Sequence, residues 1–115
     1  MENRRKHERV DFRAKAEVIS LADSSRFAAY VSTLSRAGLG MHSQQFLEVS
    51  TPVEIKISVR GEDGGRRTET VRGKVVGVHV GEAGNSYGIE FDQMLNAYSQ
   101  PSLFAYVKKH IEKGS

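Results

Sequence analysis

The sequence predicts a single all-β domain that ends in one α-helix. Turn residues recur every eight to twelve positions, and the apolar residues between them alternate with polar ones. After residue 99 the alternation changes to a helical period. The chain has 115 residues, which suits one domain with its own core. The spacing of the turns is typical of a barrel or a sandwich.

Three strands are predicted in the first half of the chain. The first spans residues 14–21 and the second spans residues 26–34, and the polar residues 22–25 form a hairpin turn between them. A tight turn at Arg36-Ala37-Gly38 leads into a short third strand, residues 39–43. Gly38 is expected to take a positive φ in this turn, because glycine does so without steric cost.

The second half of the chain predicts three more strands. Residues 44–51 form a connection, and Pro52 stands at the entrance of a strand in which Val53, Ile55, Ile57 and Val59 alternate with polar residues. The glycine-rich residues 61–65 predict a hairpin loop. A long strand, residues 68–80, is expected to bulge at Gly73 or Gly77, and residues 87–91 complete the sheet after a turn at residues 81–86.

The last segment predicts a helix over residues 99–113, approximately. Ser99 is expected to cap its N-terminus, with Pro101 in the first turn. Leu103, Val107 and Ile111 lie four residues apart and therefore form one apolar helical face. We expect this face to cover one opening or one face of the sheet.

Positive charge is concentrated at the N-terminus. The first fifteen residues contain six basic and three acidic side chains, so their net charge of +3 equals that of the whole chain. Residues 1–13 are therefore interpreted as a flexible basic arm, too poor in apolar side chains to fold alone, in front of a domain at residues 14–115. An anion is expected to bind at this arm.

The residues also exclude several classes of function. There is no cysteine, and the chain contains no nucleophile elbow, P-loop or dinucleotide fingerprint. The four histidines lack the spacing of metal ligands. We therefore expect no enzyme activity, no catalytic residue, no metal and no cofactor. No apolar run is long enough for membrane insertion or a signal peptide, which predicts a cytoplasmic protein. One small basic arm disfavours nucleic acid as a partner.

Two short segments are candidates for binding an anionic ligand. Arg5 and Arg9 lie four residues apart, with Lys6 beside the first, so two guanidiniums can converge on one compact anion. The alternative is that this segment is only a solvated tail. Thr33 and Ser35 lie two apart on a predicted strand and should face the same way, although an ordinary Ser/Thr turn has the same pattern. The following turn contains Arg36 and Gly38, and its backbone N–H groups could approach a ligand.

These two segments resemble the motifs of the PilZ domain, a bacterial receptor module for cyclic di-GMP. Arg5-Lys6-His7-Glu8-Arg9 is similar to the family's R-x-x-x-R motif, and Thr33-Leu34-Ser35-Arg36-Ala37-Gly38 is similar to its D/N-x-S-x-x-G motif. Tyr87-Gly88-Ile89-Glu90-Phe91 resembles the family's last strand. The resemblance implies a six-stranded antiparallel split β-barrel with a C-terminal α-helix.

The resemblance also implies roles for these residues. Arg5 and Arg9 would bind phosphates and guanine edges, and Lys6 stands where a second arginine is common. Thr33 and Ser35 would hydrogen-bond a guanine, while the turn of Arg36 and Gly38 would let the backbone approach it. Thr33 departs from the family pattern, where Asp or Asn is usual, because it lacks their two-atom edge and the charge of Asp.

The sequence therefore predicts a receptor or adaptor that binds cyclic di-GMP and relays its concentration to a downstream partner protein. One alternative is a degenerate PilZ-like interaction domain that does not bind the nucleotide. A small β-barrel that binds nucleic acid is a weaker alternative, because the aromatic residues available for stacking, Phe27, Tyr30 and Tyr87, are equally explained by packing.

Overall fold

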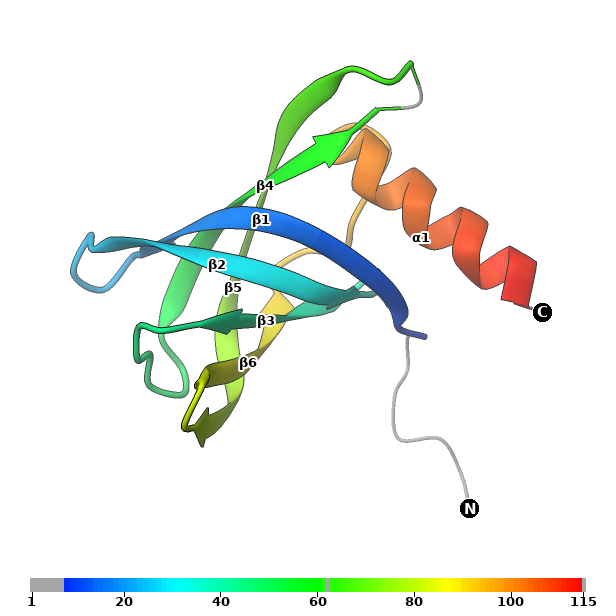
Figure 1. Ribbon diagram of the computed structural model, residues 1–115. Helices are drawn as coiled ribbons and strands as arrows, with labels where there is room; N and C mark the ends of the chain where they lie inside the picture. The colour runs from blue at the N-terminus through cyan, green and yellow to red at the C-terminus, as the bar shows by residue number, and fades with distance from the viewer. Residues whose placement is uncertain (1–7, 62, 115) are drawn as a thin grey trace.

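A computed structural model describes residues 8–61 and 63–114, which form six strands and one helix in the predicted order (Figure 1). The elements are β1 (Val10–Ser20), β2 (Arg26–Leu34), β3 (Gly38–Ser43), β4 (Pro52–Arg60), β5 (Arg66–Gly81), β6 (Gly84–Phe91) and α1 (Pro101–Gly114). The positions of the strands follow the alternation of apolar and polar residues, since every second side chain of a strand points to the same face.

The six strands close into a barrel in the order β1-β2-β3-β6-β5-β4, with every neighbouring pair antiparallel. The predicted all-β fold, a six-stranded antiparallel barrel with a C-terminal helix, is confirmed. The ladder between β1 and β4 is short, because it runs only from the pair Ala16–Ile57 to the pair Ser20–Val53. The N-terminal half of β1 therefore separates from β4, and the barrel is split at this point (Figure 1).

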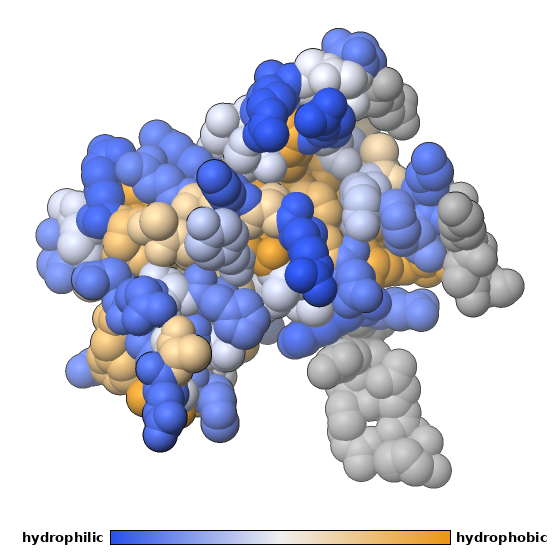
Figure 2. All heavy atoms as spheres, viewed as in Figure 1, coloured by the Kyte–Doolittle hydropathy of each residue, from blue (hydrophilic) through white to orange (hydrophobic). Residues whose placement is uncertain are grey.

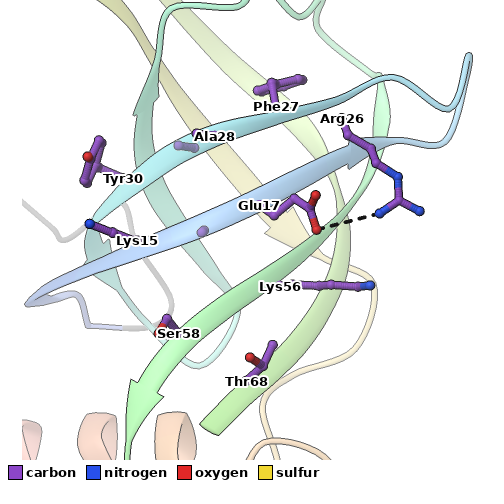
Figure 3. A pocket seen from close by; sticks show the side chains of 11 residues that line it. Lys15, Glu17, Arg26, Phe27, Ala28, Tyr30, Lys56, Ser58 and Thr68 are labelled. Carbon is purple, nitrogen blue, oxygen red and sulfur yellow. Dashed lines mark ion pairs between the residues drawn. The ribbon is translucent and has the colours of Figure 1, made fainter. Parts of the chain in front are cut away.

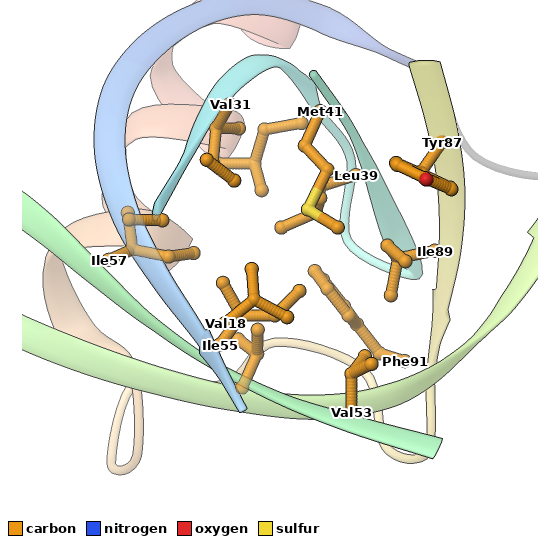
Figure 4. Close-up of a cluster of buried hydrophobic side chains, with 14 of the residues drawn as sticks. Val18, Val31, Leu39, Met41, Val53, Ile55, Ile57, Tyr87, Ile89 and Phe91 are labelled. Carbon is orange, nitrogen blue, oxygen red and sulfur yellow. The ribbon is translucent and has the colours of Figure 1, made fainter. Parts of the chain in front are cut away.

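The interior of the barrel is filled by the apolar side chains that alternate along the strands. On β4, Val53, Ile55 and Ile57 are completely buried, as their spacing predicts. Val18 of β1 and Val75 of β5 are equally buried. Figure 4 shows side chains from five of the strands converging on this core. Such a close-packed interior fixes which face of each strand points outward, and so fixes the outer surface described below.

The helix α1 begins later than predicted. Its first residue is Pro101, and the predicted cap, Ser99, instead donates its backbone N–H to Asn96 Oδ1. The N-terminal N–H groups of Ser102 and Leu103 are bound by the carboxylate of Glu69 on β5, at 2.8 and 2.9 Å. A carboxylate suits this position, because the helix dipole is positive there. Glu69 is only 4 % exposed, so the helix is attached to the barrel by a buried charged group.

The apolar face of α1 packs on the barrel as expected. Leu103 and Val107 are completely buried, and α1 lies beside β1 and β4, near the place where these two strands separate. The ring of Tyr106 meets that of Phe12 edge-on at 4.9 Å, and its hydroxyl donates a hydrogen bond to the carbonyl oxygen of Asp11. The helix therefore covers the part of the opening beside Asp11 and Phe12, while a depression lined by Arg13, Lys15, Ser58 and Arg60 remains open beside it.

These contacts also explain why β1 starts four residues before the predicted position. The prediction assigned residues 10–13 to a flexible arm, but they belong to β1, where Val10 pairs with Leu34 of β2. Phe12 packs against the core and Tyr106, which gives the segment the apolar contacts that the sequence alone did not show. The first seven residues of the predicted arm lie outside the described residues.

The hairpins and the bulge follow the sequence closely. Asp23 Oδ1 accepts the N–H of Ser25 in the β1–β2 turn, and this hydrogen bond lowers the pKa of Asp23. The ladder between β5 and β6 shifts register between Val75 and Gly77, as predicted for Gly77. The strand β6 starts at Gly84, three residues earlier than predicted, because Gly81 and Gly84 already pair across a tight turn.

Candidate ligand-binding site

The candidate site is a shallow depression of about 380 Å³ on the outer face of β2, β3, β6 and β5. It combines one arginine, several hydroxyl and imidazole groups, and three glycines. Its lining residues are Arg9, Ser32, Thr33, Gly40, Met41, His42, Gly77, Val78, His79, Ser86, Tyr87 and Gly88.

Arg9 and Thr33, two of the predicted site residues, meet in this depression. The pairing of Asp11 with Thr33 brings the start of β1 alongside the end of β2, which places Arg9 at the rim. Arg9 is exposed to solvent at this rim. One strand pairing therefore brings together two residues that lie 24 positions apart in the sequence. A guanidinium beside a hydroxyl can bind a phosphate oxygen or the edge of a base.

A row of three glycines crosses the floor of the depression. Gly40 of β3 lies opposite Gly88 of β6, and Gly88 lies opposite Gly77 of β5. A Cβ atom added at Gly77 would have no atom within 4 Å, and one at Gly88 would make an ordinary contact with Val76. Packing therefore does not require glycine at these two positions. At Gly40 the Thr33 hydroxyl lies close to the backbone, 2.7 Å from where a Cβ would be. The backbone is therefore open at Gly77 and Gly88, which permits close approach of a flat group there.

Polar groups lie beside the glycine row. The next outward-facing residues on the same strands are His42, Ser86 and His79, which are also in register with one another. Ser86 Oγ and His42 Nδ1 are hydrogen-bonded at 3.1 Å. Thr33 is paired with Gly40 and therefore continues the row at its β2 end. A ligand on the glycine floor would thus have hydrogen-bonding groups along one side of the row and at one end.

Ser35 has a different environment from Thr33. It is only 5 % exposed, and it is not among the residues that line the depression. Its Oγ accepts the N–H groups of Ala37 and Gly38 at 3.2 and 3.1 Å, and it contacts the carbonyl oxygen of Gly38 at 3.3 Å. The strand β2 ends at Leu34, so strand alternation does not extend to Ser35. In this structure the Ser35 hydroxyl stabilises the turn.

The remaining residues of the turn motif also have structural contacts. Gly38 does not have the positive φ that was expected. Glycine is needed there because a Cβ would collide with the carbonyl oxygen of Ile89 on β6. The Arg36 guanidinium lies over the ring of Phe104 on α1, 5.3 Å from its centroid, and the Arg36 carbonyl accepts the N–H of Leu95. Arg5 and Lys6 lie outside the described residues.

Sequence reasoning did not identify the glycine row or its polar neighbours as parts of a site. Isolated glycines inside strands are a usable signal, because glycine weakens a strand unless something must come close. Their alignment in one row depends on the register of three strands, which no single segment shows. His42, His79 and Ser86 likewise become neighbours only through pairing.

The described residues offer no metal centre, since no three His, Asp or Glu side chains gather closely enough to hold an ion. Within the same part of the chain, no helix has the length and apolar character needed to cross a membrane.

Comparison with known proteins identifies the family. The PilZ domain model matches residues 3–109, and the chain belongs to the PilZ domain family. No curated protein matches the chain in sequence.

Solved structures with the same fold have low sequence identity to this chain. The Bacillus subtilis inhibitor of motility, MotI/DgrA, has a TM-score of 0.75 at 12 % identity. The match covers 97 % of this chain and 54 % of MotI/DgrA, so this chain spans about half the length of that protein. The PilZ domain of YcgR from Escherichia coli, solved with c-di-GMP, has a TM-score of 0.65 at 16 % identity over 97 % of this chain and 98 % of that one. The MrkH–c-di-GMP complex of K. pneumonia has a TM-score of 0.59 at 13 % identity, covering 98 % and 55 % of the two chains.

Proposed function

We propose that this protein is a receptor for cyclic di-GMP that relays the level of the nucleotide to a partner protein. The observation that supports the proposal is the depression that Arg9, from the first family motif, and Thr33, from the second, both line, on a floor of three aligned glycines. Binding, rather than catalysis, is the function that these groups suit.

The chemistry of the depression matches a cyclic dinucleotide. Its phosphates are anionic and its guanines are flat, with hydrogen-bonding edges. The planar guanidinium of Arg9 can form paired hydrogen bonds with either a phosphate or a guanine edge. The glycine row offers a surface on which a flat ring can lie, and Thr33 and Ser86 offer hydroxyl groups at one end of it and along one side. The Ser35–Gly38 hydrogen bonds stabilise the turn at the edge of this surface.

Titration calorimetry with cyclic di-GMP tests the proposal, with single-stranded RNA as the control ligand. Arg9→Ala should weaken binding by about 2–4 kcal/mol, the range for removal of one partner of a charged, partly desolvated contact. Arg9→Lys should recover little of the loss, because an ammonium lacks the paired geometry. Arg26→Ala is the matched control, since Arg26 is an exposed arginine that pairs with Glu17 outside the depression. Equal affinity of Arg9→Ala and the wild type would refute the assignment of this site.

A second candidate function is that of an interaction domain that does not bind the nucleotide. Thr33 favours it, because its single hydroxyl replaces the two-atom edge of Asp or Asn. The same titration separates the two candidates: a folded protein that gives no heat with cyclic di-GMP would support the second and exclude the first.

A further inference from the structure

A second surface of the barrel, away from the glycine row, is a groove over β1, β2, β4 and β5. It begins where β1 separates from β4, and it has two adjoining parts of about 410 and 540 Å³ that share Lys15, Tyr30 and Ser58. Figure 3 shows the larger part, with Lys15 and Tyr30 facing Ser58 and Thr68 across it. In Figure 2, strongly hydrophilic side chains lie over β1 and over the β4–β5 ends, with apolar surface between them.

The groove is strongly positive. Six basic residues line it: Arg26, which pairs with Glu17, and five others, namely Arg13, Lys15, Lys56, Arg60 and Arg66. Among the described residues none of the five has a carboxylate partner, and Arg66 donates one hydrogen bond to Ser58 Oγ at 3.3 Å.

Among the described residues that line the groove, these cations are accompanied by a single carboxylate. This carboxylate belongs to Glu17 and is 3.7 Å from the guanidinium of the sixth basic residue, Arg26 (Figure 3). Glu17 also lies opposite Lys56 in the β1–β4 ladder. The excess of basic over acidic side chains in the lining still favours an anionic partner and repels a cationic one.

The floor of the groove contains open strand edges. The β1–β4 ladder stops at the pair Ala16–Ile57, so residues 13–15 of β1 and 58–60 of β4 have no strand partner on the sides that face each other. The open edge ends at Asp11, whose carbonyl oxygen accepts a hydrogen bond from the Tyr106 hydroxyl. An open edge can accept an extended peptide as an additional strand, through backbone hydrogen bonds.

The spacing of the cations fits such a strand. Arg13 and Lys15 on β1 point outward two residues apart, as do Ser58 and Arg60 on β4. Two residues of an extended strand span about 7 Å, so acidic side chains at every second position of an added strand would meet them in register.

Single-stranded nucleic acid is less well matched, since such sites stack successive bases on several aromatic rings. Among the described residues that line the groove, Tyr30 is the one exposed aromatic residue, at 58 %; Phe27 packs on the core.

We propose that this groove binds an extended acidic segment of a partner protein, which adds as a strand at the open edges of β1 and β4. The proposal does not depend on nucleotide binding, because it involves different residues.

Fluorescence anisotropy with defined peptides tests this proposal. The probe is a labelled decapeptide in which Glu and Thr alternate. The controls are a Lys–Thr decapeptide, a fully N-methylated Glu–Thr decapeptide, and ten-nucleotide oligouridine. Saturable binding of the Glu–Thr peptide, at least tenfold tighter than that of each control, supports the proposal. Absence of saturable binding overturns it, as does equal binding of the N-methylated peptide, which cannot donate strand hydrogen bonds. Equal or tighter binding of oligouridine overturns it in favour of a nucleic-acid site.

Charge reversal locates the binding surface. The double variant Arg13→Glu/Arg60→Glu should weaken binding of the Glu–Thr peptide about tenfold or more. Each exposed ion pair contributes little binding free energy, but charge reversal replaces two attractions with two repulsions. The matched control is Lys108→Glu/Lys109→Glu, which makes the same charge change on the exposed face of α1 and should alter binding less than twofold. Circular dichroism confirms that both variants are folded. Equal effects of the two double variants would overturn the proposal, because the attraction would then be a property of net charge.

Discussion

Gly77→Ala should have opposite effects on two quantities: it should raise the stability of the barrel and lower the affinity of the depression for its ligand. A Cβ at position 77 would have no atom within 4 Å, and the backbone there does not have a positive φ. Alanine restricts the unfolded chain more than glycine does, so the free energy of unfolding should rise by about 0.4–1 kcal/mol. The same methyl group would stand on the floor where a flat ring is proposed to lie. Forcing a ligand to accommodate it should cost about 1–3 kcal/mol, a five- to 150-fold loss of affinity for cyclic di-GMP.

Urea denaturation measures the first effect and titration calorimetry the second. Gly38→Ala is the contrasting variant, because a Cβ at position 38 would collide with the carbonyl oxygen of Ile89 and should destabilise the barrel by about 1–3 kcal/mol. A Gly77→Ala protein that binds the nucleotide as tightly as the wild type would refute the role of the glycine floor. A Gly77→Ala protein less stable than the wild type would refute the view that packing leaves this position open.

Three further variants test other contacts. Thr33→Asn should restore the amide edge usual in the family and tighten binding of cyclic di-GMP by about 0.5–1.5 kcal/mol in calorimetry; weaker binding would mean that the threonine has its own compatible geometry. Glu69→Gln removes the charge that binds the two N-terminal N–H groups of α1, and should lower the free energy of unfolding in urea by about 1–3 kcal/mol, while an unchanged value would contradict the buried cap. Tyr87→Phe removes a buried hydroxyl that accepts the N–H of Leu47 and donates to the carbonyl of Gln45, and should cost about 1–3 kcal/mol in the same assay; no cost would show that water replaces the hydroxyl.

Alternation along the strands was sufficient to predict most of the fold. On β4, apolar residues occupy every second position from Val53 to Val59, and all four are buried. This local pattern needs no knowledge of the rest of the chain. It fails where the strand ends, and Ser35 is the example: one residue beyond β2, its hydroxyl turns into the Ser35–Gly38 loop instead of following the face of Thr33.

Contacts between distant segments could not be predicted in this way. The sequence around Glu69 gives no reason to bury a carboxylate, since its partners are N–H groups more than thirty residues later. Phe12 looks like part of a polar arm until Tyr106 is placed beside it. For the candidate site, the family motifs indicated Arg9 and Thr33. The glycine row could not be predicted, because it depends on the register of β3, β6 and β5.

The position of β6 has a consequence for synthesis of the protein. This strand is the last to be translated, yet it lies between β3 and β5, where Gly38 and Gly73 allow the backbone of Ile89 and Glu90 to fit closely. A nascent chain that ends before Gly84 can form the β1–β2–β3 and β4–β5 ladders, but two strands then keep an open edge, and such edges pair readily with other chains. The ring can therefore close only after β6 has been synthesised, and a chain that terminates before Gly84 would be an aggregation-prone fragment.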